Sequence, residues 1–350
     1  MKASVLTEYG HLEWQEVEKP KCDPDKVLIK VAYGCICGSD QHIYKGEFVP
    51  RTTTPMVMGH EFGGTVAEVG SEVTGWEVGE KVAPDPIIPC MECPACKIGH
   101  YPACTSLKII GVDLNGGFQQ YIQLPPHMLY KVPASIPDKY IALIEVMGVA
   151  CHAKNRAGLK KDDSVVIWGA GKVGLCVLQA VRTVTDNTVF LVDVLPERLA
   201  LAPKYYDNIV TIDATKEDPV KVIKEKTDGK GVDVAFEVVG HSHGVPGQVE
   251  PVRGCVQSIR GAGTVCVLGL SAETTPILFK ELIWKEAKIV ASRVSHGEFA
   301  EVIDHLVNNR LKLDMIITDI LDGSKAQEAF DMLEEDPANN VKILLDFNGK

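Results

Sequence analysis

Residues 164–193, SVVIWGAGKVGLCVLQAVRTVTDNTVFLVD, decide the fold class of this chain. An apolar run leads into Gly169, Gly171 and Gly174, which form the pattern G-x-G-x-x-G ahead of a helix-like stretch. Asp193 ends the next apolar run, 19 residues after Gly174. A lone glycine pattern is weak, because ordinary turns also contain it. The preceding strand, the following helix and the acid at about this distance together predict a dinucleotide-binding βαβ unit.

The same unit indicates how a cofactor is bound and which one it is. The glycines let the backbone approach a pyrophosphate, whose charge is met by amides at the helix N-terminus. The Asp193 carboxylate is expected to bond ribose hydroxyls and to repel a 2′-phosphate, which favours NAD over NADP. Arg198 tempers this preference, because an arginine nearby can accommodate that phosphate, although it also reads as a solvated helix charge. The predicted cofactor-binding residues here are Gly169, Gly171, Lys172, Val173, Gly174, Asp193 and Arg198.

Six apolar runs in the second half of the chain predict one parallel sheet. They are apolar on both faces and separated by longer helical stretches, as in a sheet that helices cover on both sides. The runs are residues 164–169, 188–193, 208–213, 232–238, 263–269 and 288–294. Residues 299–309 then read as an amphipathic helix.

The first 145 or so residues have a different texture. Short β-branched runs, such as residues 27–33 and 63–70, alternate with glycine and proline, which predicts an irregular β-rich domain. A length of 350 residues is also long for one hydrophobic core, so about two domains are expected.

Four of the eleven cysteines stand together in CMECPACKIGHYPAC, residues 90–104. In a reducing compartment, such a cluster is read as a metal site before a disulfide framework. A zinc ion held by four thiolates is coordinatively closed, so it should stabilise a lobe of about residues 88–106 and do no chemistry. His100 lies inside the segment, but four well-spaced thiolates leave it no place as a ligand. The predicted ligands are Cys90, Cys93, Cys96 and Cys104.

Two earlier segments hold further potential ligands. GCICGSDQHIYKG, residues 34–46, contains Cys37 and His42, and GHEFGGTVAEVG, residues 59–70, contains His60. Taken singly, Cys37 is more often a buried apolar filler and His60 a satisfied core histidine. In a chain that also has a dinucleotide-binding fold and a separate four-cysteine cluster, they have another interpretation, as ligands of a second metal ion.

The set of motifs resembles the zinc-containing medium-chain alcohol and polyol dehydrogenases, the sorbitol dehydrogenases most of all. The matching pieces occur in the family's order over nearly the whole chain: CGSD, GHEFGGTVAEVG, the four-cysteine lobe, an acidic residue before CHA, and GAGKVG with its aspartate. The resemblance implies an α/β fold with a GroES-like β-rich catalytic domain and a doubly wound parallel-sheet Rossmann domain. The expected bounds are 1–146 and 298–350 for the catalytic domain and 147–297 for the NAD-binding domain.

The resemblance also implies a catalytic zinc ion, the second zinc of the chain. Cys37 and His60 would be ligands, with Glu145 at the third position and water or substrate at the fourth. Such an open position is typical of catalytic zinc. Glu61 would bind the metal directly or through water, and Asp40 would orient the His60 ring. Polyol-specific relatives usually have proline after the third ligand, whereas Val146 follows here, so Glu145 could also be a solvated acid at a helix start.

By the same resemblance, Ser39 and His42 form a proton relay in which a ribose hydroxyl of the cofactor passes the proton between them. Histidine suits this role because its ordinary pKa is near neutrality, although His42 also reads as an exposed loop residue. Arg293 is expected near the substrate pocket, with a solvent-exposed strand-end charge as the alternative, and residues 242–254 are expected to help build that pocket. The family places further cofactor contacts in two loops, here Leu268, Gly269, Leu270, Ser292, Arg293 and Val294.

Composition limits the other classes of function. The formal charge is −11 and no basic run occurs, so a nucleic-acid partner is not expected, and neither is a zinc-stabilised binding module of that kind. No signal peptide or membrane-spanning segment is evident, which predicts a cytoplasmic protein without a membrane partner.

The leading hypothesis is a zinc- and NAD-dependent dehydrogenase that acts on a secondary hydroxyl of a polyol, sugar or sugar acid. Three alternatives stay open. A simple alcohol, butanediol or threonine could be the substrate; the chain could be a zinc-stabilised binding module instead of an enzyme; or it could be a fold relative that has lost its catalytic metal. A homo-oligomer, tetramer or dimer, is implied by the resemblance alone.

Overall fold

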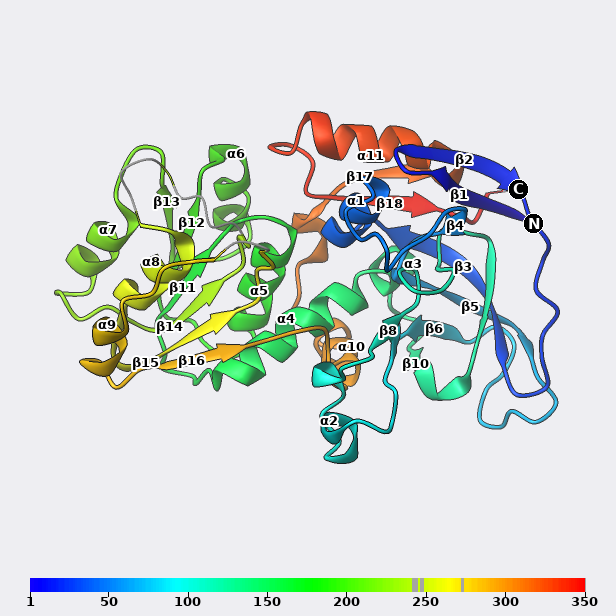
Figure 1. Ribbon diagram of the computed structural model, residues 1–350, viewed down its shortest axis with the longest axis horizontal. Coiled ribbons are helices and arrows are strands. Elements are labelled where there is room, and N and C mark those ends of the chain that lie inside the picture. Colours follow the sequence, from blue (N-terminus) through cyan, green and yellow to red (C-terminus); the bar gives the residue numbers. More distant parts are fainter. Residues whose placement is uncertain (241–244, 246–248, 272–273, 350) are drawn as a thin grey trace. The chain divides into compact units, whose positions relative to one another are not determined.

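The computed structural model describes residues 1–240, 245, 249–271 and 274–349. The chain divides into two compact units (Figure 1). The first comprises Met1–Gly148 and Ser295–Lys350, and the second comprises Val149–Val294. Each unit has its own sheet and its own core, so each is described by itself.

The first unit is built around a seven-stranded, mostly antiparallel sheet in the order β10-β6-β5-β3-β18-β17, with β9 also paired to β3. Its strands are β3 (Val27–Cys35), β5 (Glu61–Val69), β6 (Lys81–Pro84), β9 (Tyr121–Leu124), β10 (Leu129–Val132), β17 (Ile317–Asp322) and β18 (Lys342–Asp346). Two smaller sheets contain β1 (Lys2–Glu8), β2 (His11–Glu16) and β4 (Met56–Val57), and β7 (Ile87–Ile88) and β8 (Lys108–Ile109). Side chains such as Ile29, Val31 and Phe62 are buried in one apolar core.

Strand register brings three distant segments to one end of this sheet. Cys35, the last residue of β3, pairs with Glu61, the first residue of β5, and on its other side with Leu344 of β18. The residues just after β3, just before β5 and at the start of β18 therefore lie close together. This end of the sheet holds the second group of potential ligands predicted from the sequence.

Short helices complete the first unit. They are α1 (Gly38–Tyr44), α2 (Pro94–Lys97), α3 (Asp138–Ile141), α4 (Ile144–Ala157), α10 (Phe299–Val307) and α11 (Ala326–Glu335), and α4 continues into the second unit. Helix α10 confirms the amphipathic helix predicted at residues 299–309, which ends two residues earlier than expected.

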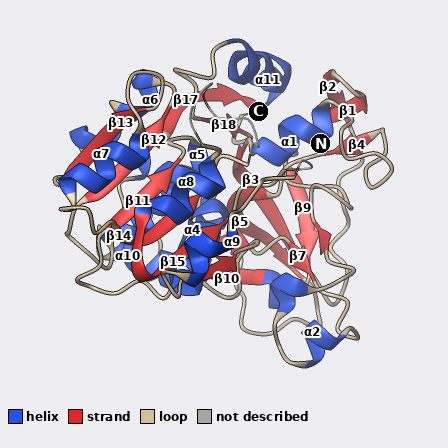
Figure 2. Cartoon of the chain, turned by 60° about the vertical axis from the view of Figure 1, so that its left-hand side comes forward, coloured by secondary structure: helices blue, strands red, loops and turns tan. Residues whose placement is uncertain are grey.

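The second unit is a six-stranded parallel sheet in the order β13-β12-β11-β14-β15-β16. Its strands are β11 (Val165–Trp168), β12 (Val189–Asp193), β13 (Ile209–Asp213), β14 (Val232–Glu237), β15 (Ile259–Val267) and β16 (Lys288–Ala291). The helices are α5 (Lys172–Arg182), α6 (Pro196–Leu199), α7 (Pro219–Lys226), α8 (Pro251–Ser258) and α9 (Phe279–Ile283). Figure 2 shows α7 and α8 side by side against the strands. The six predicted strands and the doubly wound parallel sheet are confirmed.

Four of the six strands match their predicted bounds to within one residue at each end, whereas β16 ends at Ala291 instead of residue 294 and β15 differs at both ends. β15 begins at Ile259 instead of residue 263, because the chain keeps pairing with β14 through a bulge between the pairs Val232–Ile259 and Val234–Thr264. Ala262 takes a positive φ of 56° within this bulge. Glycines around such a residue look like a turn in the sequence, although here the strand passes through them.

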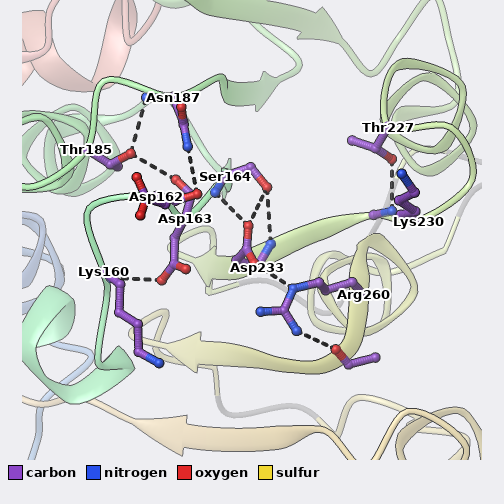
Figure 3. Close-up of polar contacts among 12 residues, drawn as sticks. Lys160, Asp162, Asp163, Ser164, Thr185, Asn187, Thr227, Lys230, Asp233 and Arg260 are labelled. Atoms are coloured by element: carbon purple, nitrogen blue, oxygen red, sulfur yellow. Dashed lines mark hydrogen bonds and ion pairs between the residues drawn. The ribbon is translucent and has the colours of Figure 1, made fainter.

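The amino edge of the parallel sheet is fastened by hydrogen bonds (Figure 3). The backbone amide and the hydroxyl of Ser164 both donate to Asp233 Oδ2 at 2.7 Å, and Arg260 Nε donates to Asp233 Oδ1 at 2.5 Å. Asn187 Nδ2 donates to the carbonyl of Asp162 at 2.6 Å. Ligand-binding groups are expected at the opposite edge, because open parallel sheets bind ligands at the carboxyl ends of their strands. Among the described residues, no helix is long and apolar enough to cross a membrane.

Candidate functional site

The glycine turn lies between β11 and α5, where the strand order of the parallel sheet reverses. Gly169 has a φ of +110°, and Gly171 is the N-cap residue of α5, which begins at Lys172 and continues through Val173. A Cβ atom at Gly174 would lie 1.8 Å from the carbonyl oxygen of Gly169. Only glycine fits at Gly174, and the amides at the start of α5 can meet an anionic group, as in dinucleotide-binding folds.

Asp193 lies next to this turn at the carboxyl end of β12. Its Oδ2 accepts a hydrogen bond from the amide of Ala170 at 2.6 Å, and its Oδ1 accepts from Val194 and Leu195 at 2.7 and 2.9 Å. The three amides fix the carboxylate beside the glycines. Nη1 of Arg198 lies 3.4 Å from the position that a Cβ at Gly171 would take. The arginine therefore lies close to the turn, and its effect on the choice between NAD and NADP stays a prediction.

The other predicted cofactor residues follow the ends of the last two strands. Leu268, Gly269 and Leu270 come directly after β15, and Ser292, Arg293 and Val294 come directly after β16. They lie at the edge where parallel sheets bind ligands, and their roles in cofactor binding stay predictions. Residues 242–254, expected in the substrate pocket, lie partly outside the described residues.

A buried acid that was not predicted from the sequence lies at the same edge. Glu237 ends β14 with 1 % of its surface exposed, and its Oε1 accepts from the amides of Val239 and Gly240 at 2.8 and 3.0 Å. Its carbonyl accepts from the amides of Leu268 and Gly269. Glu237 thus joins the loops after β14 and β15. An acid at the end of an apolar run, as in VDVAFEV, is the signal that could have revealed it.

A cavity of about 420 Å³ opens at the opposite, amino edge of this sheet. It is lined by Ser164, Asn187, Thr188, Phe190, Val210, Lys226 and Thr227. The hydroxyl of Ser164 already donates to Asp233, and that of Thr227 donates to the carbonyl of Ile223. The cavity therefore offers few uncommitted polar groups, and we assign it no part in the chemistry.

The four clustered cysteines converge around α2. Their Sγ atoms all lie within 4.8 Å of one another, and Cys90 and Cys96 Sγ are 4.0 Å apart. Zinc–sulfur bonds of about 2.3 Å in a tetrahedron put sulfurs about 3.8 Å apart, so the group fits zinc. Backbone amides lower the pKa of Cys93 to about 6, whereas burial raises the pKa of Cys96 to about 12. A bound cation would bring all four into the thiolate form.

Three of the scattered ligand candidates also converge. One ligand atom each of Cys37, His60 and Glu61 lies within 4.8 Å of the others, and both His60 and Glu61 are buried. The convergence follows from the strand register, because Cys37 caps α1 two residues after β3, while His60 directly precedes β5 and Glu61 begins it. A set of one sulfur, one nitrogen and one oxygen suits a catalytic zinc ion.

Asp40 and Ser39 surround the His60 ring. Asp40 Oδ1 lies 3.3 Å from Nδ1, while Asp40 Oδ2 accepts from the amide of Cys37 at 2.8 Å. Ser39 Oγ lies 3.4 Å from Nε2. Burial alone would lower the pKa of His60, but the negative charges of Asp40 and Cys37 raise it well above its usual value. A carboxylate on Nδ1 leaves Nε2 as the ligand nitrogen, an arrangement common around zinc.

Glu61 has a buried partner that the sequence analysis did not single out. Nζ of Lys342 donates to Glu61 Oε2, and both residues are fully buried. Although burial lowers the pKa of Lys342, the negative charges of Cys35, Glu61 and Cys37 raise it well above its usual value. Glu61 Oε1 is buried and has no hydrogen-bond partner among the described residues. One carboxylate oxygen is thus neutralised, and the other is available for a cation.

Glu145, the predicted third ligand, begins α4 with 7 % of its surface exposed. It is not part of the group formed by Cys37, His60 and Glu61. Burial raises its pKa to about 8, with opposing effects from the charges of His60 and Glu61. The choice between Glu61 and Glu145 as third ligand therefore stays open. The reading of Glu145 as a solvated helix-start acid is wrong.

His42 lies on α1, outside both groups, with about half of its side chain exposed. This exposure suits the predicted exchange of a proton with water, but its role in a relay stays a prediction.

Comparison with known proteins covers nearly the whole chain. Residues 23–134 match the family described as alcohol dehydrogenase GroES-like domain, and residues 173–308 match the family described as zinc-binding dehydrogenase. L-threonine 3-dehydrogenase from Pyrococcus horikoshii is 36 % identical over 99 % of each chain. D-arabitol-phosphate dehydrogenase from Enterococcus avium is 32 % identical over 97 % of this chain and 95 % of the relative. An alcohol dehydrogenase structure from Escherichia coli CFT073, complexed with NADH, superimposes with a TM-score of 0.87 at 29 % identity over 99 % of each chain.

Proposed function

We propose, from the premise that this chain belongs to the zinc-containing medium-chain alcohol and polyol dehydrogenases, that it oxidises a secondary hydroxyl of a polyol, sugar or sugar acid to a ketone with NAD. The observation that carries the proposal is the convergence of Cys37, His60 and Glu61 at one end of the sheet. Zinc there would supply Lewis-acid polarisation of the alcohol oxygen, and NAD would supply the hydride acceptor.

The residues around the ligands have distinct tasks in this reaction. Cys37 and His60 hold the metal, with Glu145 or Glu61 as the third ligand and Asp40 orienting the His60 ring. Ser39, 3.4 Å from His60 Nε2, accepts the proton of the substrate hydroxyl. His42, half exposed, releases that proton to water. Lys342 offsets the charge of Glu61, so that the metal and its ligands are not left with excess negative charge.

The four-cysteine lobe holds a second, structural zinc ion in this proposal. Its ligands are all thiolates, and no position is left for substrate. We also propose that residues 1–146 and 298–350 form the catalytic domain, that residues 147–297 bind NAD, and that the protein is a homo-oligomer.

Threonine is a second candidate substrate. The P. horikoshii relative, an L-threonine 3-dehydrogenase, has a slightly higher identity than the arabitol-phosphate dehydrogenase. Both reactions remove a hydride from a secondary carbinol carbon, so the same ligands serve either one. The substrates differ in the groups beside that carbon, which are hydroxyls in polyols and a charged amino-acid group in threonine.

The test is NAD reduction, followed by the absorbance of NADH, with a panel of polyols, sugar acids, polyol phosphates, 2,3-butanediol and L-threonine. We expect activity with a polyol or sugar acid, higher with NAD than with NADP. Cys37→Ala should lose at least about a thousandfold of the activity, which is about 4 kcal/mol of transition-state stabilisation. The NAD affinity of this variant should stay within about threefold of the wild-type value, since the substitution leaves the glycine turn unchanged. Activity that persists in Cys37→Ala would refute the proposed mechanism.

A further inference from the structure

The segment directly after α1 folds back onto the His42 ring. The amide of Gly46 donates to the carbonyl of Ile43, and the amide of Glu47 donates to the carbonyl of His42, both at 2.9 Å. Gly46 has a φ of +75°. These two bonds and the left-handed glycine define a Schellman motif, the helix ending in which the second residue past the cap returns to the last turn. The backbone alone therefore places Glu47 beside His42.

Two side chains of this ending hold the imidazole ring. Glu47 Oε2 lies 2.5 Å from Nδ1 of His42. The ring of Phe48 stacks on the imidazole, with centroids 6.1 Å apart and planes 4° from parallel. The Schellman motif usually has an apolar contact between the positions that His42 and Glu47 occupy. Here a carboxylate and an imidazole replace that contact, which points to a polar task.

The carboxylate decides where the proton of the neutral imidazole sits. An ionised carboxylate only accepts hydrogen bonds, and a neutral imidazole has one N–H, so Nδ1 must carry the hydrogen. Nε2 is then left with its lone pair. Which ring nitrogen is protonated is set by the hydrogen bond that the other one makes. A relay histidine needs this arrangement, with one nitrogen free to accept the incoming proton.

We propose that Glu47 is a positioning residue for the proton relay: it keeps the hydrogen of His42 on Nδ1, so that Nε2 accepts the proton released through Ser39. The proposal rests on the proposed function. When Nε2 takes the proton, the ring becomes an imidazolium paired with the Glu47 carboxylate. The ring then returns one proton to water, and no electrons are exchanged in this step.

The chain contains a matched pair that lacks this geometry. His11 Nε2 lies 3.2 Å from Glu13 Oε1 on strand β2. The side chains of His11 and Glu13 are 51 % and 46 % exposed, against 55 % and 52 % for His42 and Glu47. If His42 and Glu47 form only an ordinary surface ion pair, removing either glutamate should have equally little effect. Glu13→Ala is therefore the control for Glu47→Ala.

The direct test is nitrogen-15 NMR of the zinc-loaded protein with labelled histidines at about pH 8.5, where an ordinary imidazole is neutral. The spectrum of His42→Gln identifies the His42 signals. We expect the hydrogen on Nδ1 in the wild type, redistribution toward Nε2 in Glu47→Ala, and no change at His42 in Glu13→Ala. A hydrogen on Nε2 in the wild type, or a wild-type pattern in Glu47→Ala, would overturn the proposal.

Kinetics tests whether this positioning serves the relay. With the best alcohol of the panel, Glu47→Ala should lower kcat about fivefold and raise its solvent isotope effect, because exposed ion pairs contribute little. The KM for NAD should stay within about twofold. The kcat of Glu47→Gln should lie between those of the wild type and Glu47→Ala, since the glutamine amide oxygen still accepts a hydrogen bond from Nδ1. A redistributed hydrogen with unchanged kcat would overturn the relay role. If the wild type oxidises no alcohol, the proposed function fails, while the spectra still decide the positioning.

Discussion

The two ligand clusters of the first unit are built in opposite ways. The four-cysteine cluster comes from residues 90–104, and a short helix brings its thiolates together. The cluster of Cys37, His60 and Glu61 depends on the register of three strands and gains Lys342, 281 residues from Glu61 in sequence. The first is locally encoded, and its four thiolates would leave a bound zinc ion no open position. The second depends on the tertiary fold and has an available oxygen on Glu61.

The two clusters also differ in the groups that surround them, which are backbone amides in the first and ionisable side chains in the second. Backbone amides contact sulfur in the four-cysteine cluster, as when the Cys90 amide donates to Cys104 Sγ at 3.3 Å. The second cluster is surrounded by buried ionisable groups, namely Asp40, Glu145 and Lys342. Buried charges cost stability unless they are paired or bind a metal, so they are retained where chemistry needs them. The comparison supports the proposal that the first cluster stabilises the fold and that the second is the reactive one.

The largest effect should come from breaking the closed cluster. Cys104→Ser removes a buried thiolate ligand, and because metal binding and folding of such a lobe are coupled, we expect a loss of more than about 5 kcal/mol. Urea unfolding and limited proteolysis between residues 88 and 106 measure it. Cys37→Ala is the matched control, since it should lose activity while its unfolding free energy stays within about 1 kcal/mol of the wild-type value. Equal stability losses in the two variants would remove the distinction between the clusters.

Lys342→Met tests the buried ion pair beside the cluster of Cys37, His60 and Glu61. It leaves the Glu61 carboxylate buried without its cation, which should cost the zinc-depleted protein about 3–5 kcal/mol of unfolding free energy. The zinc-loaded protein should lose less, because the metal can offset the charge of Glu61. Denaturant unfolding with and without zinc measures both values.

The double variant Glu61→Gln, Lys342→Met provides the control. It removes both charges, so its stability should recover most of the loss. A double variant as unstable as Lys342→Met would show that the cost comes from packing instead of the unpaired carboxylate.

The smallest effect concerns Asp85, whose pKa is raised to about 6 by burial and by the charge of Glu298. A raised pKa means that the folded chain holds this proton more tightly than the unfolded chain does. The stability that it contributes is complete below the unfolded pKa of 3.8 and is lost as the pH rises through about 6. Asp85→Asn should therefore gain about 1–3 kcal/mol at about pH 8, and less at about pH 5.5. Urea unfolding at the two pH values checks this difference, and a gain independent of pH would contradict it.

The sequence predicted the elements whose signals are local. The six strands of the second unit appear as apolar runs, GAGKVG forms the turn at Gly169, and the four cysteines stand close in the chain. The family resemblance drawn from these motifs is confirmed by the comparisons. Each of these signals depends on neighbours within about 30 residues, where periodicity and spacing carry the information.

The rest depends on contacts between distant segments. Lys342 looks like any strand residue in VKILLDF, and only the pairing of β18 with β3 beside β5 brings it to Glu61. The β15 bulge was missed because the glycines around Ala262 resemble a turn. Glu47 gains its contact with His42 from a helix ending that no single residue type reveals. Long-range register and local backbone geometry are the two kinds of information that residue patterns lack.

The zinc content per chain, measured by elemental mass spectrometry in the wild type and in Cys37→Ala, decides whether the second cluster binds a metal ion of its own. We expect two zinc ions in the wild type and one in Cys37→Ala, with the remaining ion in the four-cysteine lobe. A wild type with one zinc ion that Cys37→Ala keeps would contradict it, because Cys37, His60 and Glu61 would then hold no metal.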